Sequence, residues 1–468
     1  MALVIKFGGT SVGSVEAMRR TAGLVQDTIE EWVQVVVVAS AMGTKPTKVT
    51  DLLLQGAYAS AAGDAAACAQ AAEKLRAVHL EVIDGLLSPE QERQQVLAEN
   101  TRFIDRFEDL CRAVLVLGEL TPRALDAISA MGEQMSVRIL AAYLRQLGQV
   151  AEAIDAAELI LTDANFQAAT PQVQETARRT TQRLLPLLAA GTTPVVTGFI
   201  GATAGGTMTT LGRGGSDFSA AILGQALEAD EVWIWTDVDG VMTADPRLVP
   251  GARTIPTLTY REVAELAYYG AGVLHPKTIR PCVEGAIPLR IKNTFNPEHE
   301  GTVIVPDNGG TTNGMKAVTA IEALSLLTVE GKGMIGVPGI AARTFGAVAD
   351  REVNVLLITQ ASSEQSICFA VPETTRQTVV AALEQEFAAE LARRDIDRIW
   401  AMHPVSIVTV VGAGMRGTPG ISGRIFGALG SKNLNIIAIA QGSSECSISL
   451  VVDGADTGQA VQYIHEML

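Results

Sequence analysis

The chain has 468 residues, of which 48% are hydrophobic and 4% aromatic, and its formal net charge is −15. This length allows two or three domains with their own cores. The acidic balance argues against a nucleic-acid-binding surface, which would need a basic face. Lys6 interrupts the first apolar run, and no later apolar stretch reaches the roughly 18 residues that a membrane span requires. The composition therefore predicts neither a signal peptide nor a membrane-bound protein.

The cysteines indicate the redox compartment of the protein, and the histidines indicate whether it has a metal site. The five cysteines are scattered, odd in number and free of C-x-x-C spacing, and the five histidines show no metal-ligand spacing. We therefore expect a reduced, cytoplasmic protein with buried thiols and without a metal site built from its own side chains.

The chain opens with a short apolar run that leads into IKFGGTSVGS, residues 5–14. Val4 and Ile5 predict a buried strand, and Gly8 and Gly9 predict a loop whose amides can approach an anion closely. The lysine precedes the glycines, so the segment is not a P-loop, and the glycine spacing does not match G-x-G-x-x-G. Taken alone, the pattern is as typical of a plain tight turn as of a phosphate site.

Strands and helices then alternate as far as residue 305. VQVVVVAS at 33–40 is a continuous β-branched run, typical of a parallel strand that is covered on both faces. Residues 55–115 have helical periodicity and predict an inserted helical subdomain. This order predicts an α/β domain with a mostly parallel central sheet between helices. Residues 305–314 are rich in glycine and asparagine and read as a linker.

Beyond the linker the chain repeats itself without gaps. Met334 matches Met415 and Pro338 matches Pro419, a constant offset of 81 residues. Each repeat reads as strand, helix, strand, strand, helix, which predicts a ferredoxin-like βαββαβ sandwich. The second repeat lacks a closing strand, and residues 316–322 form a spare one. We infer that the first repeat is inserted in the second, with domains at 1–305, at 323–398, and at 315–322 together with 399–468.

The densest polar segment runs from residue 210 to 247. Its GRGGSD turn places Arg213 beside the start of a predicted helix, which Ser216 or Asp217 could cap. An arginine next to helix-start amides can receive an anion, and Asp217 could orient a cation or a lysine there. Capping explains Ser216 or Asp217 equally well, but it leaves Arg213 unexplained.

Polar side chains also follow a predicted strand in WTDVDGVMTADPR. The strand ends on Thr236 and Asp237, and Asp239, Asp245 and Arg247 follow in the loop. Ligands of open α/β sheets bind at the carboxyl ends of the strands. The segment therefore favours a nucleotide site over a solvated turn.

These motifs together resemble the aspartate kinases, a family with the amino-acid kinase fold. The segments that carry the resemblance are KFGGTSVGS, ASAMG, AMGEQMS, TLGRGGSD, WTDVDGV, TADPR and VLHPKTI. The repeated tail resembles the paired ACT regulatory domains of that family, and is most similar to the kinase half of the bifunctional aspartokinase–homoserine dehydrogenases. The resemblance implies an amino-acid kinase fold followed by two ferredoxin-like ACT domains. Because the chain stops where the dehydrogenase would begin, we expect a monofunctional enzyme.

The resemblance also implies roles for individual residues, with ATP and Mg²⁺ as cofactors and L-aspartate as substrate. Lys6 and Asp217 would be catalytic, with Lys6 neutralising charge on the transferring phosphoryl group. The substrate residues would be Ser40, Thr50, Glu133, Phe199, Arg213 and Ser216. The ATP-binding residues would be Lys6, Gly8, Gly9, Ser11, Thr236, Asp237, Met242, Asp245 and Arg247. The effector residues would be Gly339, Ile340, Asn354, Gln360, Gly420, Ile421, Asn435 and Gln441.

The chain departs from the family pattern at three places. The loop after residue 43 carries extra residues, so Thr47 competes with Thr50 for the substrate, and we prefer Thr50. Met242 stands where relatives commonly have an aromatic, a mild change because a thioether can also cover a base. Gly272 stands where relatives commonly have a lysine, so one nucleotide contact is in doubt, with Lys277 or Lys292 as substitutes.

The implied chemistry needs no histidine or serine–histidine pair. The nucleophile is the β-carboxylate of the substrate, and catalysis requires alignment and positive charge. We expect feedback inhibition by threonine, with lysine as second choice, in a homodimer or larger homo-oligomer that associates through the ACT domains. Two alternatives stay open: another carboxylate or carbamate kinase of the same fold, and an inactive amino-acid sensor.

Overall fold

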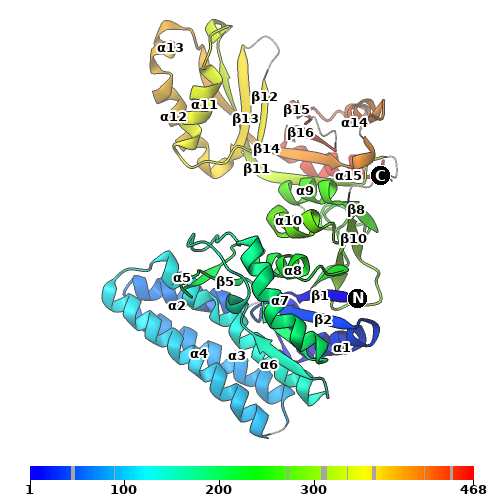
Figure 1. Ribbon diagram of the computed structural model, residues 1–468. Helices are drawn as coiled ribbons and strands as arrows, with labels where there is room; N and C mark the ends of the chain where they lie inside the picture. The colour runs from blue at the N-terminus through cyan, green and yellow to red at the C-terminus, as the bar shows by residue number, and fades with distance from the viewer. Residues whose placement is uncertain are drawn as a thin grey trace. The chain divides into compact units, whose positions relative to one another are not determined.

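The structure, a computed structural model, describes residues 1–43, 48–88, 90–270, 274–306, 314–334, 336–360, 365–415, 417–442 and 446–468. Figure 1 shows its helices and strands. The chain forms two compact units. The first comprises Met1–Val241, Thr254–Tyr260 and Val273–Asn308, and the second comprises Met242–Arg253, Arg261–Gly272 and Gly309–Leu468. Within the described ranges, no helix is long and apolar enough to cross a membrane.

The first unit is built on an eight-stranded sheet with the order β3-β4-β2-β1-β7-β9-β10-β8. Its strands are β1 (Ala2–Phe7), β2 (Gln34–Ala39), β3 (Ala151–Ile154), β4 (Thr193–Thr197), β7 (Glu231–Thr236), β8 (Thr257–Thr259), β9 (Leu289–Asn293) and β10 (Thr302–Val305). Neighbouring strands are parallel except β9 and β10. The apolar runs of β1 and β2 are buried, as expected for central strands covered on both faces. The strand β1 therefore lies in the middle of the sheet, between β2 and β7.

Helices and a small hairpin complete the first unit. The helices are α1 (Val15–Glu31), α2 (Val49–Ala61), α3 (Ala65–Leu86), α4 (Glu90–Leu117), α5 (Pro122–Ser129), α6 (Met131–Gln146), α7 (Val173–Ala189), α8 (Gly215–Ala226) and α10 (Pro276–Gly285). The long helices α3 and α4 lie side by side (Figure 1). Leu53, Leu75 and Phe107 of the helical subdomain share one hydrophobic core with Phe7 and Val37 of the sheet. The hairpin pairs β5 (Ile200–Ala202) with β6 (Met208–Thr210).

The second unit contains a six-stranded sheet with the order β12-β13-β11-β14-β16-β15. Its strands are β11 (Ala317–Glu330), β12 (Leu357–Gln360), β13 (Ser366–Pro372), β14 (Arg398–Val411), β15 (Ala438–Ala440) and β16 (Ser447–Asp453). Its helices are α9 (Tyr260–Tyr268, all but the first residue), α11 (Ile340–Ala349), α12 (Arg376–Glu386), α13 (Ala388–Arg393), α14 (Ile421–Gly430) and α15 (Thr457–His465).

The two repeats share this sheet through two long strands. β11 and β14 are antiparallel: residues 317–321 pair with 411–407, and residues 326–330 pair with 402–398, with irregular register near Leu324. The spare strand predicted at 316–322 and the first strand of the first repeat are therefore one continuous strand. Alternate residues of this strand face opposite sides of the sheet. Leu327 and Val329 pack in a core with Leu383 of α12, so Thr328 points to the other side.

Candidate active site and regulatory cavities

An ion pair connects the central strand to a helix start. Lys6, the penultimate residue of β1, is 8% exposed. Its Nζ lies 2.6 Å from Oδ1 of Asp217 in the first turn of α8. An ion pair that is largely removed from water is screened little by solvent. The structure thus holds a buried ammonium group at the carboxyl end of the central strand.

The glycine loop after β1 is packed against neighbouring strand ends. The Gly8 amide donates to the carbonyl oxygen of Trp235 (3.1 Å), so it is not free for a phosphate as the sequence led us to expect. A Cβ atom at Gly9 would lie only 3.0 Å from the carbonyl oxygen of Ala41. Ser11 is buried, and its Oγ lies 2.7 Å from Oγ1 of Thr294. The loop therefore has room for a close backbone approach but little for side chains.

The GRGGSD turn depends on backbone conformations that favour glycine. Gly212 has φ +79° and Gly214 has φ +68°, and Gly214 is the N-cap residue of α8. The prediction that Ser216 or Asp217 caps this helix was wrong, because both lie inside its first turn. Ser216 is buried there. Arg213 is exposed and makes no ion pair with a described residue, so its guanidinium can bind an anionic group.

Glu133 provides a buried carboxylate near the end of β2. It is 4% exposed, and burial raises its pKa to about 8, although a hydrogen bond from the Ala41 amide acts in the opposite direction. Its Oε2 contacts no hydrogen-bond donor among the described residues. Ser136 of the same helix donates to the carbonyl oxygen of Ser40 (2.7 Å). Ser40 and Glu133 are thereby held close together, and the open carboxylate oxygen suits a cationic ligand.

Two further predicted substrate residues have special backbone positions. Phe199 has φ +68° and its amide donates to Oγ of Ser219 in α8 (3.0 Å). Its ring packs closely on Gly215, because a Cβ atom built on Gly215 would lie only 2.6 Å from Cδ2 of Phe199. Thr50 is the second residue of α2. The competing Thr47 lies outside the described residues.

Two lysines, Lys277 and Lys292, were predicted to replace the lysine that relatives commonly have at the position of Gly272. Gly272 lies outside the described residues. Lys292 on β9 holds its Nζ over the rings of Trp233 and Trp235, at 5.4 and 5.1 Å from their centroids. Burial lowers its pKa. Its ammonium group is thus engaged with an aromatic face. Lys277 is an exposed residue at the start of α10.

The predicted nucleotide residues belong to both units. Thr236 Oγ1 donates to Oδ1 of Asp237 (3.3 Å) at the end of β7 in the first unit. In the second unit Arg247 donates through Nε to both oxygens of Asp245 (3.0 Å each) and lowers the pKa of that carboxyl. Met242, also in the second unit, is half-buried.

Each repeat of the second unit has a cavity at its PGI loop. Gly339, Ile340 and Gln360 line a cavity of about 310 Å³ in the first repeat. Ile421 and Gln441 line the matching cavity of about 320 Å³ in the second. The helices beside these cavities begin after left-handed glycines, Gly339 (φ +93°) and Gly420 (φ +88°). Asn354 and Asn435 are exposed and line neither cavity.

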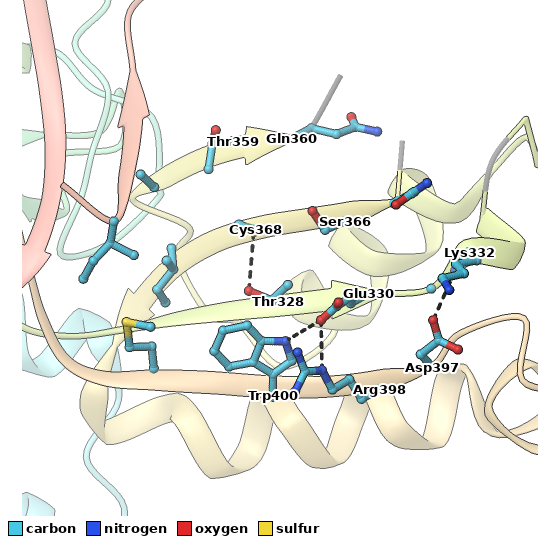
Figure 2. Close-up of a pocket in the computed structure, with 16 residues that line it drawn as sticks. Thr328, Glu330, Lys332, Thr359, Gln360, Ser366, Cys368, Asp397, Arg398 and Trp400 are labelled. Carbon is cyan, nitrogen blue, oxygen red and sulfur yellow. Dashed lines mark hydrogen bonds and ion pairs between the residues drawn. The ribbon is translucent and has the colours of Figure 1, made fainter. Parts of the chain in front are cut away.

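A larger cavity, of about 550 Å³, lies on the face of the sheet opposite α11 and α12, and no sequence motif predicted it. Figure 2 shows Trp400, Arg398 and Glu330 pointing toward one another in it. Trp400 Nε1 and Arg398 Nε donate to Oε2 of Glu330 (3.1 and 2.9 Å). Residues of β11, β12, β13 and β14 line this cavity, and they come together only when the four strands pair. The repeat pattern does not include Trp400 and Arg398.

Comparisons with known proteins agree with this architecture. The model of the amino acid kinase family matches residues 1–293, and the ACT domain model matches 327–387 and 408–468. The bifunctional aspartokinase/homoserine dehydrogenase 1 of Zea mays is 38% identical, over 99% of this chain and 50% of its own length. This chain thus spans about half the length of the bifunctional relatives.

Relatives of similar length are also found. The aspartokinase of Schizosaccharomyces pombe is 32% identical over 100% of this chain and 92% of its own. The crystal structure of E. coli aspartokinase III in complex with aspartate and ADP has 30% identity and a TM-score of 0.79, with 100% of both chains covered. The chain therefore belongs to the amino acid kinase family and, within it, to the aspartokinases.

Proposed function

We propose that this protein transfers the γ-phosphoryl group of ATP to the β-carboxylate of L-aspartate, giving 4-phospho-L-aspartate and ADP. The observation that carries the proposal is the buried pair of Lys6 and Asp217, 2.6 Å apart, at the carboxyl end of the central strand. The exposed Arg213 lies in the turn that begins the same helix. The solved complex of E. coli aspartokinase III with aspartate and ADP supports this choice of ligands.

Lys6 supplies the positive charge that phosphoryl transfer requires. Asp217 holds its ammonium group in place, so little reorganisation is needed when charge develops on the phosphoryl oxygens. The attacking carboxylate is ionised at neutral pH, so no general base is needed. The part of the chain that the structure describes contains no cluster of three His, Cys, Asp or Glu side chains able to hold a metal. The Mg²⁺ that accompanies ATP would supply further positive charge to the phosphoryl oxygens.

Glu133 and Arg213 would hold the two ends of the amino acid. The open oxygen of the buried Glu133 suits the ammonium group, which would favour the ionised carboxylate and offset its raised pKa of about 8. The guanidinium of Arg213 suits the α-carboxylate, because its fork can donate two parallel hydrogen bonds. Ser40 and Thr50 would donate to the substrate, and Phe199 would pack against it.

The PGI cavities of the second unit would bind an amino-acid effector, with threonine first and lysine second. Amides at the starts of α11 and α14 suit a carboxylate, and the side chains of Gln360 and Gln441 suit the polar remainder. E. coli aspartokinase III has been solved in complex with lysine and aspartate in a T-state, which supports an amino-acid effector for the family.

The chain would self-associate through the first repeat. The half of the sheet that the second repeat forms carries α14 and α15 on one face. Its other face is covered by α9 and by Tyr269, the residue that follows α9. Thr319 donates to the Tyr269 carbonyl oxygen (3.0 Å), and Ser447 donates to Glu265 (2.7 Å). In the half of the sheet that the first repeat forms, the matching positions are Trp400 and Ser366. Trp400 of β14 pairs there with Thr328 of β11, as Thr319 of β11 pairs with Thr409 of β14. Both line the 550 Å³ cavity instead.

The charges of this cavity fit a second copy of the same surface. It carries two acidic side chains, Glu330 and Asp397, and two basic ones, Lys332 and Arg398. A two-fold axis brings one surface against itself, so acids can oppose bases. A homodimer that covers Trp400 is therefore the assembly we propose.

The experiment is an ADP-release assay of the purified chain with ATP, Mg²⁺ and a panel of acceptors. Hydroxylamine trapping identifies an acyl phosphate product. We expect turnover with L-aspartate and none with N-acetylglutamate or carbamate. Turnover with one of those acceptors would assign another kinase of the same fold. Threonine or lysine binding without turnover on any acceptor would assign an amino-acid sensor.

A further inference from the structure

Asp126 is a buried carboxylate that joins two segments of the first unit. It lies in α5 and is 1% exposed. Its Oδ2 accepts from the Thr210 amide (2.9 Å) and its Oδ1 accepts from the Thr210 hydroxyl (2.8 Å). Both oxygens also accept from the Gln167 amide (3.1 and 3.0 Å). Asp126 makes no ion pair with any described residue, so these hydrogen bonds are what stabilises its charge.

The partners of Asp126 lie next to the Arg213 turn. Thr210 is the last residue of β6, three positions before Arg213. Gln167 has φ +69°. Its carbonyl oxygen packs closely on Gly212, because a Cβ atom built on Gly212 would lie only 2.9 Å from that oxygen. One carboxylate thus fixes both the strand that leads into the turn and the loop that packs against it.

Asp126 is also tied to the helix that carries Glu133. α5 and α6 follow each other with only Ala130 between them, and Glu133 lies in the first turn of α6. Moving α5 would move the start of α6. The contacts of Asp126 therefore connect the Arg213 turn to the helical run formed by α5 and α6, which carries Glu133. These two segments are far apart in the sequence.

We propose that Asp126 is a positioning residue for substrate recognition, because it fixes the Arg213 turn relative to the helical run that carries Glu133. This inference rests on the proposed function, in which these two side chains hold the ends of the aspartate. A displacement of about 1 Å between two groups that orient a substrate is enough to reduce binding or turnover strongly. Asp126 itself does not touch the substrate.

The test uses the full chain and two substitutions. Asp126→Asn keeps the shape but replaces one acceptor oxygen by an NH2 donor. Because the Gln167 amide contacts both oxygens of Asp126, the new donor opposes that amide in either orientation of the side chain. Thr210→Val removes only the hydroxyl donor. We expect the KM for aspartate to rise about tenfold in D126N and about threefold in T210V, with the KM for ATP within twofold of the wild-type value. Thr210→Ser keeps the hydroxyl and should restore the wild-type KM.

Asp163→Asn is the matched control. Asp163 accepts from the amides of Asn165 and Thr170 (3.1 and 3.0 Å) in the loop that contains Gln167, but it is exposed, and among the described residues its side chain makes no hydrogen bond to β6. D163N should leave both KM values unchanged. Equal effects of D163N and D126N, a rise in both KM values, or a wild-type aspartate KM in D126N and T210V would each overturn the inference.

If D126N does not fold, T210V and T210S decide the question by themselves. The proposed function is tested separately by the wild type. A wild-type protein that phosphorylates aspartate and a T210V variant with an unchanged aspartate KM would reject the positioning role alone. A wild-type protein without turnover on aspartate would reject both.

Discussion

Lys6 Nζ lies 2.6 Å from Asp217 Oδ1, so an ion pair links the central strand of the sheet to the first turn of α8. The two side chains are 10% and 15% exposed. A charge placed and desolvated in this way stabilises a transition state better than a charge in water.

The first prediction concerns Lys6. Lys6→Met should lower kcat about 100-fold or more, which corresponds to about 2.7 kcal/mol of lost transition-state stabilisation. The KM for aspartate should change little, because Lys6 acts on the phosphoryl group. Steady-state ADP release measures both constants. Lys292→Met is the matched control, because its ammonium group lies over the Trp233 and Trp235 rings. Normal turnover of K6M would remove Lys6 from the mechanism.

The second prediction concerns Arg213. Arg213→Lys keeps the charge but loses the bidentate fork, so the KM for aspartate should rise about tenfold while the KM for ATP changes little. Arg280→Lys serves as control, since Arg280 pairs with Glu284 on the surface of α10 (2.7 Å). If the KM for ATP rises instead, the turn binds the nucleotide and our placement of the substrate is wrong.

The third prediction concerns the pH dependence of stability. Burial raises the pKa of Glu133 from 4.5 to about 8, so between these values the folded protein binds a proton that the unfolded chain has lost. The free energy of unfolding of the wild type should therefore fall as the pH rises through this window. The Glu133→Gln variant has no carboxyl group to titrate at this position, so its free energy of unfolding should not fall in this way.

Thermal unfolding at pH 5 and at pH 8 measures the difference. Relative to the wild type, E133Q should gain at least about 1 kcal/mol, or about 2–4 °C in Tm, between the two pH values. Glu119→Gln, at an exposed position, should show no such gain. A Tm difference between E133Q and the wild type that is independent of pH would contradict the raised pKa. The same variant should lose aspartate binding.

The fourth prediction concerns the effector. Threonine titrated at saturating aspartate should inhibit the wild type, and a coupling free energy of about 1–3 kcal/mol is enough for a strong response. Gln360→Ala and, separately, Gln441→Ala should show which cavity binds the effector. A wild type that ignores both threonine and lysine, or full sensitivity in both variants, would make the repeat purely structural.

The fifth prediction concerns assembly. Trp400→Glu adds a carboxylate to each side of the proposed interface and should turn a dimer into a monomer, as measured by light scattering after size exclusion. Val116→Glu is the control, because Val116 is 80% exposed on α4. A W400E variant that stays dimeric would place the interface elsewhere.

The sequence alone determined the local features. The β-branched run of β2 predicted a strand covered on both faces, because an apolar run without alternation has no solvent face. The constant offset between the repeats predicted matching loops, and Gly339 and Gly420 indeed have nearly equal left-handed φ values. A glycine in the sequence can predict a left-handed backbone conformation because few other residues tolerate that conformation.

Tertiary structure decided the contacts between distant residues. The sequence left open whether Asp217 caps α8 or orients a lysine. Only the folded chain shows that Gly214 is the N-cap residue and that Asp217 pairs with Lys6. Asp126 reads as an ordinary helical residue until Thr210 comes within hydrogen-bond distance. The cavity around Trp400 depends on the pairing of β11 with β14. Burial and pairing depend on the whole packed chain, whereas sequence patterns report only a residue's own backbone preference and the face on which it lies.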